Sequence, residues 1–158
     1  MYFVKFEKQF MSTAIKNKIT LIDDSPSEPI LLASAIQKSE RNIVLESFDD
    51  SIYAVEELAR RGKEDEESLP NLILLDLNMP GYNGIEVLGK LRKDENLCFI
   101  PIIVMTSSSL DADMREALKE GANCVIVKPT GHKRYVEVVQ IIYDFWFNTV
   151  KRLDIGFF

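Results

Sequence analysis

Short apolar runs alternate with longer amphipathic segments along the 158 residues, and this alternation limits the folds open to the chain. The apolar runs occupy 19–22, 42–48, 71–75, 100–105 and 124–127. Such an alternation is typical of βα units around a parallel sheet. The third run has no polar alternation after its first residue, as a central strand buried on both faces requires. The sequence therefore predicts a single α/β domain with five strands.

The helices are predicted from capping residues and breakers between these runs. Ser25 and Pro26 are suited to open the first helix, and Gly62 is suited to stop the second. The later helices are expected at 51–61, 85–93, 107–120 and 133–150. The segment KEDEESLP is expected to be a solvated loop, and its acidic residues 64–67 lack the Gly and ligand pattern of a calcium loop.

Composition excludes several classes of partner. The net charge of -6 repels nucleic-acid phosphates, so nucleic-acid binding is disfavoured. Cys98 and Cys124 have no metal-ligand spacing, which favours the reducing cytoplasm. The N-terminal aromatics are interrupted by charges, and polar residues interrupt the last helix, so neither an export signal nor a membrane span is expected. Residues 1–17 are expected to be an N-terminal tail, of which 1–10 are either dispensable or an upstream start, and 151–158 a C-terminal tail.

Polar residues of a particular kind follow the apolar runs. Asp23 and Asp24 follow the first run, Asp76 the third, Thr106 the fourth and Lys128 the fifth. Ligands of open α/β sheets bind at the carboxyl ends of the strands. We therefore expect these five side chains to converge in one pocket.

Three carboxylates in one pocket repel one another unless a cation neutralises them. Because the donors are oxygens and neither His nor Cys is near, the set suits Mg²⁺ better than Zn²⁺. Phosphoryl transfer requires positioning and charge neutralisation, so Asp76 is a candidate for an acyl phosphate. Lys128 offers a charge, and Thr106 a hydroxyl, to the phosphoryl oxygens.

The motifs IDDSP, LLDLNMPGYNG, IPIIVMTSSS and CVIVKP, in this order, resemble the response-regulator receiver family over residues 18–150. The resemblance implies a flavodoxin-like, doubly wound parallel sheet of order 2-1-3-4-5 with five helices, the last one extended. It also implies a phosphoacceptor, not an enzyme, with slow autodephosphorylation at most.

The resemblance assigns further roles within the site. It implies that Asp24 binds Mg²⁺ directly, Asp23 through water, Asp76 as the acceptor and Asn78 through its main-chain carbonyl. Thr106 and Lys128 match the family's hydroxyl and lysine positions, and Ser107 matches a small residue. The family usually has Tyr or Phe at the aromatic switch position, where this chain has Val125. The resemblance suggests a cis bond at Lys128–Pro129, but most X–Pro bonds in folded proteins are trans, so the sequence leaves both forms open.

The segments LPNLILLDLNMP and ENLCFIPIIVMTSS and the FW near the end resemble single-domain regulators that partner phytochrome-type histidine kinases. This narrower resemblance implies a stand-alone, cytoplasmic response regulator that relays a signal by phosphorylation-dependent protein–protein interaction. The last helix has apolar residues on more than one face, so we expect a homodimer through it. The residues expected at that interface are Tyr135, Val139, Ile142, Phe145 and Trp146.

Other interpretations stay open at this point. Each polar residue taken singly suits a helix cap, an Asx turn or a surface position, and His132 suits a solvent-facing loop. A phosphohydrolase with an aspartyl phosphate is disfavoured because such enzymes generally place D-x-D after the first strand. A flavodoxin-like nucleotide binder is disfavoured because Asp23 and Asp24 would repel an anionic cofactor there.

Overall fold

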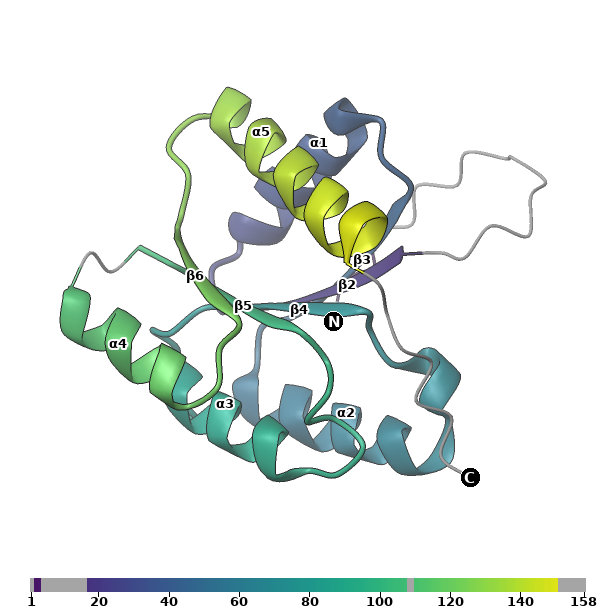
Figure 1. Cartoon of the computed structure of the whole chain (residues 1–158), viewed down its shortest axis with the longest axis vertical. Helices are drawn as coiled ribbons and strands as arrows, with labels where there is room; N and C mark the ends of the chain where they lie inside the picture. The colour runs from purple at the N-terminus through teal and green to yellow at the C-terminus, as the bar shows by residue number, and fades with distance from the viewer. Residues whose placement is uncertain (1, 4–16, 108–109, 151–158) are drawn as a thin grey trace.

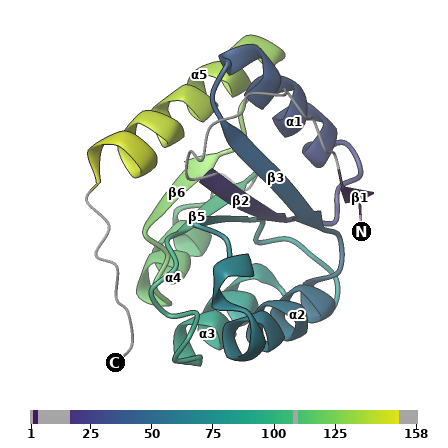
Figure 2. The same ribbon diagram turned by 90° about the vertical axis from the view of Figure 1, so that its right-hand side faces the viewer.

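The computed structural model describes residues 2–3, 17–107 and 110–150. A twisted sheet lies between two layers of helices, with α1 (Glu28–Ser39) and α5 (His132–Tyr143) on one face (Figures 1 and 2). The opposite face carries α2 (Ser51–Glu64), α3 (Gly84–Lys93) and α4 (Asp111–Lys119) (Figure 2). The βα units agree with the alternating pattern, and the two helical layers give the doubly wound architecture that the family resemblance implied.

Five strands of the sheet are parallel and follow the predicted order. They are β3 (Ile43–Phe48), β2 (Asn17–Ile22), β4 (Leu72–Leu75), β5 (Ile102–Thr106) and β6 (Cys124–Val127). Numbered among the parallel strands alone, this is the order 2-1-3-4-5. A sixth, two-residue strand that the sequence did not predict, β1 (Tyr2–Phe3), pairs antiparallel with the outer edge of β3.

The core has two halves because the central strand is buried on both faces. Leu72 and Leu74 of β4 pack with the apolar residues of α1 and α5. Ile73 and Leu75 point the other way and pack with α2, α3 and α4. All four side chains are buried, which is why the third apolar run shows no polar alternation.

The first two helices each differ from the sequence prediction at one boundary. The first helix begins at Glu28, not at Ser25, because the amide of Ser25 donates to the Asp23 carboxylate and its hydroxyl bonds that of Ser27. Gly62 does not stop α2, which continues to Glu64. A Cβ at Gly62 would lie 2.9 Å from the Cβ of Asn96, so this glycine permits Asn96 to pack closely against α2.

The remaining differences concern the segments after α2 and α5 and the start of α4. Part of the predicted acidic loop forms the last turn of α2 and a short 3₁₀ helix, η1 (Glu66–Ser68). The last helix is extended as predicted, but from Asp144 to Thr149 its turns are π-helical (η2). The fourth helix, predicted at 107–120, begins at Asp111 with Leu110 and not a serine at its N-cap. Of the three serines predicted to cap it, positions 108 and 109 lie outside the described residues.

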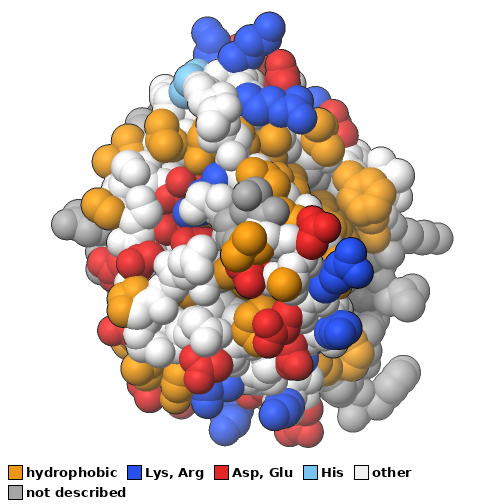
Figure 3. Space-filling model, turned by 90° about the vertical axis from the view of Figure 1, so that its left-hand side faces the viewer, with side chains coloured by type: hydrophobic (Ala, Val, Ile, Leu, Met, Phe, Trp, Pro, Cys, Tyr) orange, Lys and Arg blue, Asp and Glu red, His pale blue; other side chains and the backbone are white. Residues whose placement is uncertain are grey.

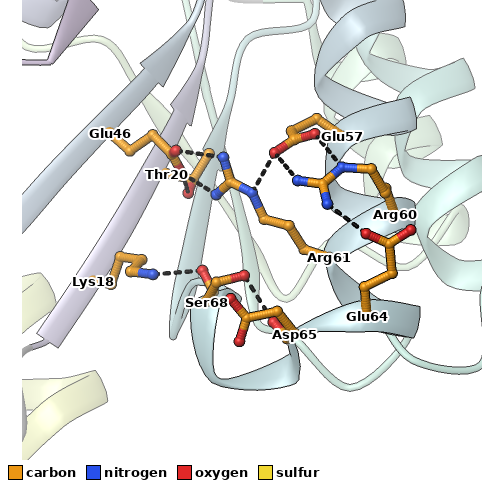
Figure 4. A network of polar contacts seen from close by, with 9 residues as sticks. All are labelled: Lys18, Thr20, Glu46, Glu57, Arg60, Arg61, Glu64, Asp65 and Ser68. Carbon is orange, nitrogen blue, oxygen red and sulfur yellow. Dashed lines mark hydrogen bonds and ion pairs between the residues drawn. The ribbon is translucent and has the colours of Figure 1, made fainter.

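A buried ion pair fastens α2 to the sheet far from the polar strand ends (Figure 4). Arg61 of α2 donates to both carboxylate oxygens of Glu46 on β3, at 2.8 and 2.9 Å. The hydroxyl of Thr20 on β2 also donates to Glu46, at 3.1 Å. These bonds satisfy a carboxylate that is only 5% exposed, so they hold two strands and one helix in a single arrangement.

Candidate functional site

The polar residues after β2, β4 and β6 are held by continuations of the sheet's own hydrogen bonding. The amide of Asp23 donates to Phe48 O and that of Asp76 to Ile22 O, both at 3.0 Å. The amide of Lys128 donates to the carbonyl of Thr106, the last residue of β5, at 2.8 Å. These main-chain bonds place the ends of the strands side by side at one edge of the sheet.

Three carboxylates form a compact oxygen cluster at this edge. One oxygen each from Asp23, Asp24 and Asp76 lies within 4.8 Å of the others. Asp23 and Asp76 are buried at 1% and 5% exposure, whereas Asp24 is exposed. This all-oxygen set with one side open to solvent fits a hard divalent cation.

Lys128 lies against the same cluster. Its Nζ is 2.6 Å from Oδ2 of Asp23 and 3.3 Å from Oδ2 of Asp76. Seen from the side that carries the β6–α5 connection, acidic side chains gather around a recessed basic group (Figure 3). A single cationic side chain thus contacts the predicted acceptor and one of the predicted metal ligands.

The electrostatics of the site follow from its burial. Desolvation raises the pKa of the Asp23 carboxyl, and the hydrogen bond from Lys128 offsets only part of this rise. Burial would lower the pKa of Lys128, but its hydrogen bond to Asp23 and the nearby carboxylates raise the pKa above its usual value. Lys128 is therefore a fixed positive charge. A bound divalent cation would favour the ionised form of Asp23 in the same way.

The orientation of Asp76 is fixed by the β4–α3 connection. Oδ1 of Asp76 accepts the amide of Leu77 at 2.8 Å, and the amide of Gly84 donates to Leu77 O at 2.9 Å. A Cβ on Gly84 would lie 2.3 Å from the carbonyl oxygen of Asp76. Glycine at this position therefore lets the start of α3 approach the acceptor.

The other predicted site residues take different positions around this centre. Thr106 is fully buried, whereas the next residue, Ser107, is exposed. Asn78, two residues after Asp76, is also exposed. Val125 is half-buried and packs into the core shared with α2, α3 and α4. The Lys128–Pro129 bond, whose form the sequence left open, is trans. His132 is exposed, as expected, and its Nε2 lies 2.9 Å from Oγ of Ser34.

Sequence reasoning missed Glu28, a further carboxylate of the site. Glu28 is 4% exposed, and its Oε2 lies 3.9 Å from Lys128 Nζ. Its Oε1 accepts the hydroxyl of Tyr135 at 2.8 Å. In the sequence Glu28 looks like an ordinary acidic residue in the first turn of a helix, where it complements the helix dipole. No local pattern distinguishes it from a solvated residue.

The prediction for the last helix was wrong for three of its five interface residues. Tyr135, Val139 and Ile142 are 3–4% exposed, because that face of the helix packs on α1 and the sheet. Phe145 is 51% exposed, and Trp146 is half-buried against the same core. The apolar residues of this helix thus divide between the core and a smaller surface patch.

Comparison with known proteins assigns the chain to a family. A family model described as the response regulator receiver domain matches residues 19–140. The chain belongs to this family. Among curated relatives, the response regulator Rcp1 of Synechocystis sp. is 33% identical to this receiver domain over 132 residues, covering 84% of this chain and 90% of Rcp1.

Solved structures give the same assignment. The phosphorylated cyanobacterial phytochrome response regulator RcpA superposes with a TM-score of 0.76 at 29% identity, covering 87% of this receiver domain and 98% of RcpA. The Mn²⁺-bound form of Rcp1 has a TM-score of 0.74 at 31% identity, and the match covers 87% of this receiver domain and 99% of Rcp1. The residues of this receiver domain fit a divalent cation on their own chemistry, through the cluster of Asp23, Asp24 and Asp76.

Proposed function

We propose that this receiver domain is a stand-alone response regulator in which Asp76 accepts a phosphoryl group from a histidine kinase in a Mg²⁺-dependent reaction. The observation that carries the proposal is the position of Lys128. Its Nζ lies 3.3 Å from Asp76 Oδ2, in a pocket whose other walls are the carboxylates of Asp23 and Asp24. Lys128 favours a state with extra negative charge on Asp76 once a divalent cation neutralises the neighbouring carboxylates.

In the proposed reaction the P–N bond of a kinase phosphohistidine breaks and a P–O bond forms to Asp76, while the imidazole leaves with a proton taken from solvent. The amide of Leu77 holds Oδ1, so the other oxygen of Asp76 faces the cationic side of the pocket. Lys128 then binds one phosphoryl oxygen, and the buried hydroxyl of Thr106 binds another. Ser107, which is exposed, leaves room for the donor.

Asp23, Asp24, Asp76 and the main-chain carbonyl of Asn78 would hold the Mg²⁺. When bound, the ion neutralises charge on the transferred phosphoryl oxygens. The proposed direct ligand, Asp24, is the exposed member of the cluster, so the ion has access from solvent. Asp23 is buried, and the amide of Ser25 donates to its Oδ1, which orients this carboxylate toward the pocket.

Acetyl phosphate tests the acceptor without a kinase. We expect a phosphate-affinity gel to retard the protein only when acetyl phosphate and Mg²⁺ are both present. Asp76→Asn should remove the retarded band, whereas Asp111→Asn, at an exposed acid on α4, should keep it. A retarded band that persists in Asp76→Asn contradicts the assignment of the acceptor. Multiple turnover of a generic phosphate ester would instead support a phosphohydrolase.

The proposed kinase is of the phytochrome type. The phytochrome response regulator RcpA supports this, and so does RPA3017, a response regulator in red light signaling of R. palustris, which has a TM-score of 0.76 at 26% identity. We expect phosphoryl transfer to Asp76 from a phytochrome-type kinase to be faster than from other histidine kinases, which a kinase-pairing assay measures. Equal rates from all donors would contradict the pairing.

We also propose a homodimer through the exposed part of the last helix and a cytoplasmic location. The expected N-terminal tail at 1–17 is corrected in part, because residues 2–3 pair with β3 and Asn17 begins β2, whereas the receiver domain at 18–150 and the tail at 151–158 stay proposals. Ile141 and Phe145 are 60% and 51% exposed and line a shallow groove of about 320 Å³ with Ile126 and Trp146. In the described parts of the chain no helix is long and apolar enough to span a bilayer.

Sedimentation tests the dimer. At micromolar concentration we expect a dimer whose dissociation constant rises at least tenfold in Phe145→Ser. Ile30→Ser, which changes an equally exposed apolar residue on α1, should leave the dimer intact. A monomer at micromolar concentration contradicts the proposal.

A further inference from the structure

A line of buried polar contacts leads from the acceptor to α5. Lys128 Nζ lies 3.3 Å from Asp76 Oδ2 and 3.9 Å from Glu28 Oε2, so the ammonium group that Asp23 holds at 2.6 Å also lies between these two carboxylates. Glu28 also contacts α5, because its Oε1 accepts a hydrogen bond from the hydroxyl of Tyr135 at 2.8 Å. Glu28 belongs to the first turn of α1, and Tyr135 to the first turn of α5.

These contacts make the environment of Glu28 depend on Lys128. Glu28 is 4% exposed, and a carboxylate so far from water needs partners to stay ionised. Its polar partners in the described residues are Tyr135, through a hydrogen bond, and Lys128, through its charge. A movement of the ammonium group away from Glu28 therefore weakens the electrostatic stabilisation of its carboxylate. The hydrogen bond from the hydroxyl of Tyr135 is then the main interaction that stabilises Glu28.

We propose that Glu28 and Tyr135 are positioning residues for Lys128, and that their hydrogen bond transmits the phosphorylation state of Asp76 to α5. This inference rests on the proposed function. A phosphoryl group adds negative charge on the Asp76 side of Lys128, so the ammonium group moves toward it and away from Glu28. The Glu28–Tyr135 pair then rearranges, and the first turn of α5 moves with it.

The connection ends on the helix that carries the exposed apolar patch. Tyr135 is anchored in the core between α1 and the sheet, and Ile141 and Phe145 lie further along the same helical segment on its exposed side. A change at the start of α5 therefore alters the orientation of a surface that a partner can contact. Val125, by contrast, offers β6 no polar group with which to carry such a signal.

Amide NMR spectra with and without beryllium fluoride and Mg²⁺ test the inference, because beryllium fluoride mimics a phosphoryl group on an aspartate. In the unmodified protein we expect shifts both around Thr106 and in the first turn of α5. Tyr135→Phe keeps the ring in the core and removes only the hydroxyl. It should reduce the α5 shifts at least twofold and leave those around Thr106 unchanged. Tyr143→Phe removes a hydroxyl about two turns further along the helical segment and should change neither set.

Kinetics give a second measurement. Glu28→Gln should change the maximal rate of phosphorylation by acetyl phosphate at least threefold, with the half-saturating acetyl phosphate concentration unchanged, because the neutral amide no longer attracts Lys128. Unchanged α5 shifts in Tyr135→Phe, together with an unchanged rate in Glu28→Gln, would overturn this inference but leave the proposed function intact. If the unmodified protein responds neither to beryllium fluoride nor to acetyl phosphate, the proposed function fails, and the inference fails with it.

Discussion

Lys128 is the residue on which the balance of charge in the pocket depends. Asp23, Asp76 and Glu28 all lie within 4 Å of its ammonium group, and all three are buried. Like charges so close together destabilise the fold unless a cation compensates them. The resting protein uses Lys128 as that compensating charge, so the same residue serves folding and the proposed reaction.

Removing this charge should destabilise the protein in a pH-dependent way. Lys128→Met leaves the carboxylates unpaired, and we expect a loss of about 2 to 3 kcal/mol in the free energy of unfolding at pH 7. The folded-state pKa of Asp23, already above its ordinary value of 3.8, should rise further. A carboxyl group whose pKa is raised on folding lowers the free energy of unfolding at a pH above its folded-state pKa, and this cost disappears at a pH well below its ordinary pKa. The loss should therefore shrink between pH 7 and pH 4.5.

Urea unfolding at the two pH values measures the effect of Lys128→Met. Lys119→Met, at an exposed position in the last turn of α4, serves as the control and should change stability little at either pH. An equal loss for Lys128→Met at both pH values would mean that the carboxylates do not depend on Lys128.

The strand-end residues were predictable because a parallel sheet brings the carboxyl ends of its strands to one edge whatever the intervening loops. Asp23, Asp24, Asp76 and Lys128 needed only this rule, and Thr106 lies beside them in the sheet. Glu28 and Tyr135 were not predictable, because their contact depends on how α1 and α5 pack across the sheet face. A periodicity within one helix carries no information on the partner of another.

The helices show a similar division between local and tertiary causes. The pattern of α3 was clear in sequence, and Asn83 and Glu86 form a reciprocal capping box at its start. Gly62 was misread as a stop, because its role is to allow Asn96 close to α2. The apolar surplus of α5 was also misread, since most of that surplus faces α1 and the sheet.

The start of α3 should not tolerate a side chain. Gly84→Ala places a Cβ against the Asp76 carbonyl, and we expect a loss of about 2 kcal/mol together with slower phosphorylation by acetyl phosphate. Gly89→Ala, within the same helix, meets only the Glu120 carboxylate at 3.6 Å and should stabilise the protein by about 0.5 to 1 kcal/mol. Chemical denaturation of both variants checks this, and a neutral Gly84→Ala would show that the loop can move aside.

The attachment of α2 to the sheet gives a second matched pair of variants. Arg61→Met leaves the buried carboxylate of Glu46 without its bidentate partner, so we expect a loss of about 3 kcal/mol (Figure 4). Arg60→Met removes only an exposed arginine that pairs along the helix surface and should have no measurable effect. Thermal melts separate the two, and the double change of Arg61 and Glu46 to Met should recover part of the loss.

Across the complete fold, folding and cation binding are linked. The carboxylate cluster exists only when the ends of β2 and β4 are side by side, so a divalent cation binds the folded chain in preference to the unfolded one. At ten times its dissociation constant, Mg²⁺ should add about 1.4 kcal/mol of stability. Melting curves with and without Mg²⁺ measure this gain.

Asp24→Asn should remove most of the Mg²⁺-dependent gain in stability, because it removes the exposed ligand. Asp111→Asn should retain the gain, since Asp111 is an exposed acid on α4. A full Mg²⁺ effect in Asp24→Asn would place the ion elsewhere on the molecule.

The exposure of Asp24 has a consequence for the lifetime of the signal. Asp23, Asp76 and Thr106 are buried, whereas Asp24 is exposed, so the rim beside Asp24 is one way by which solvent reaches the pocket. The water that hydrolyses an acyl phosphate must enter by the same opening as the ion. A target protein that rests on this rim would shield the phosphate from attack, and the duration of the response would then be set by how long the target stays bound.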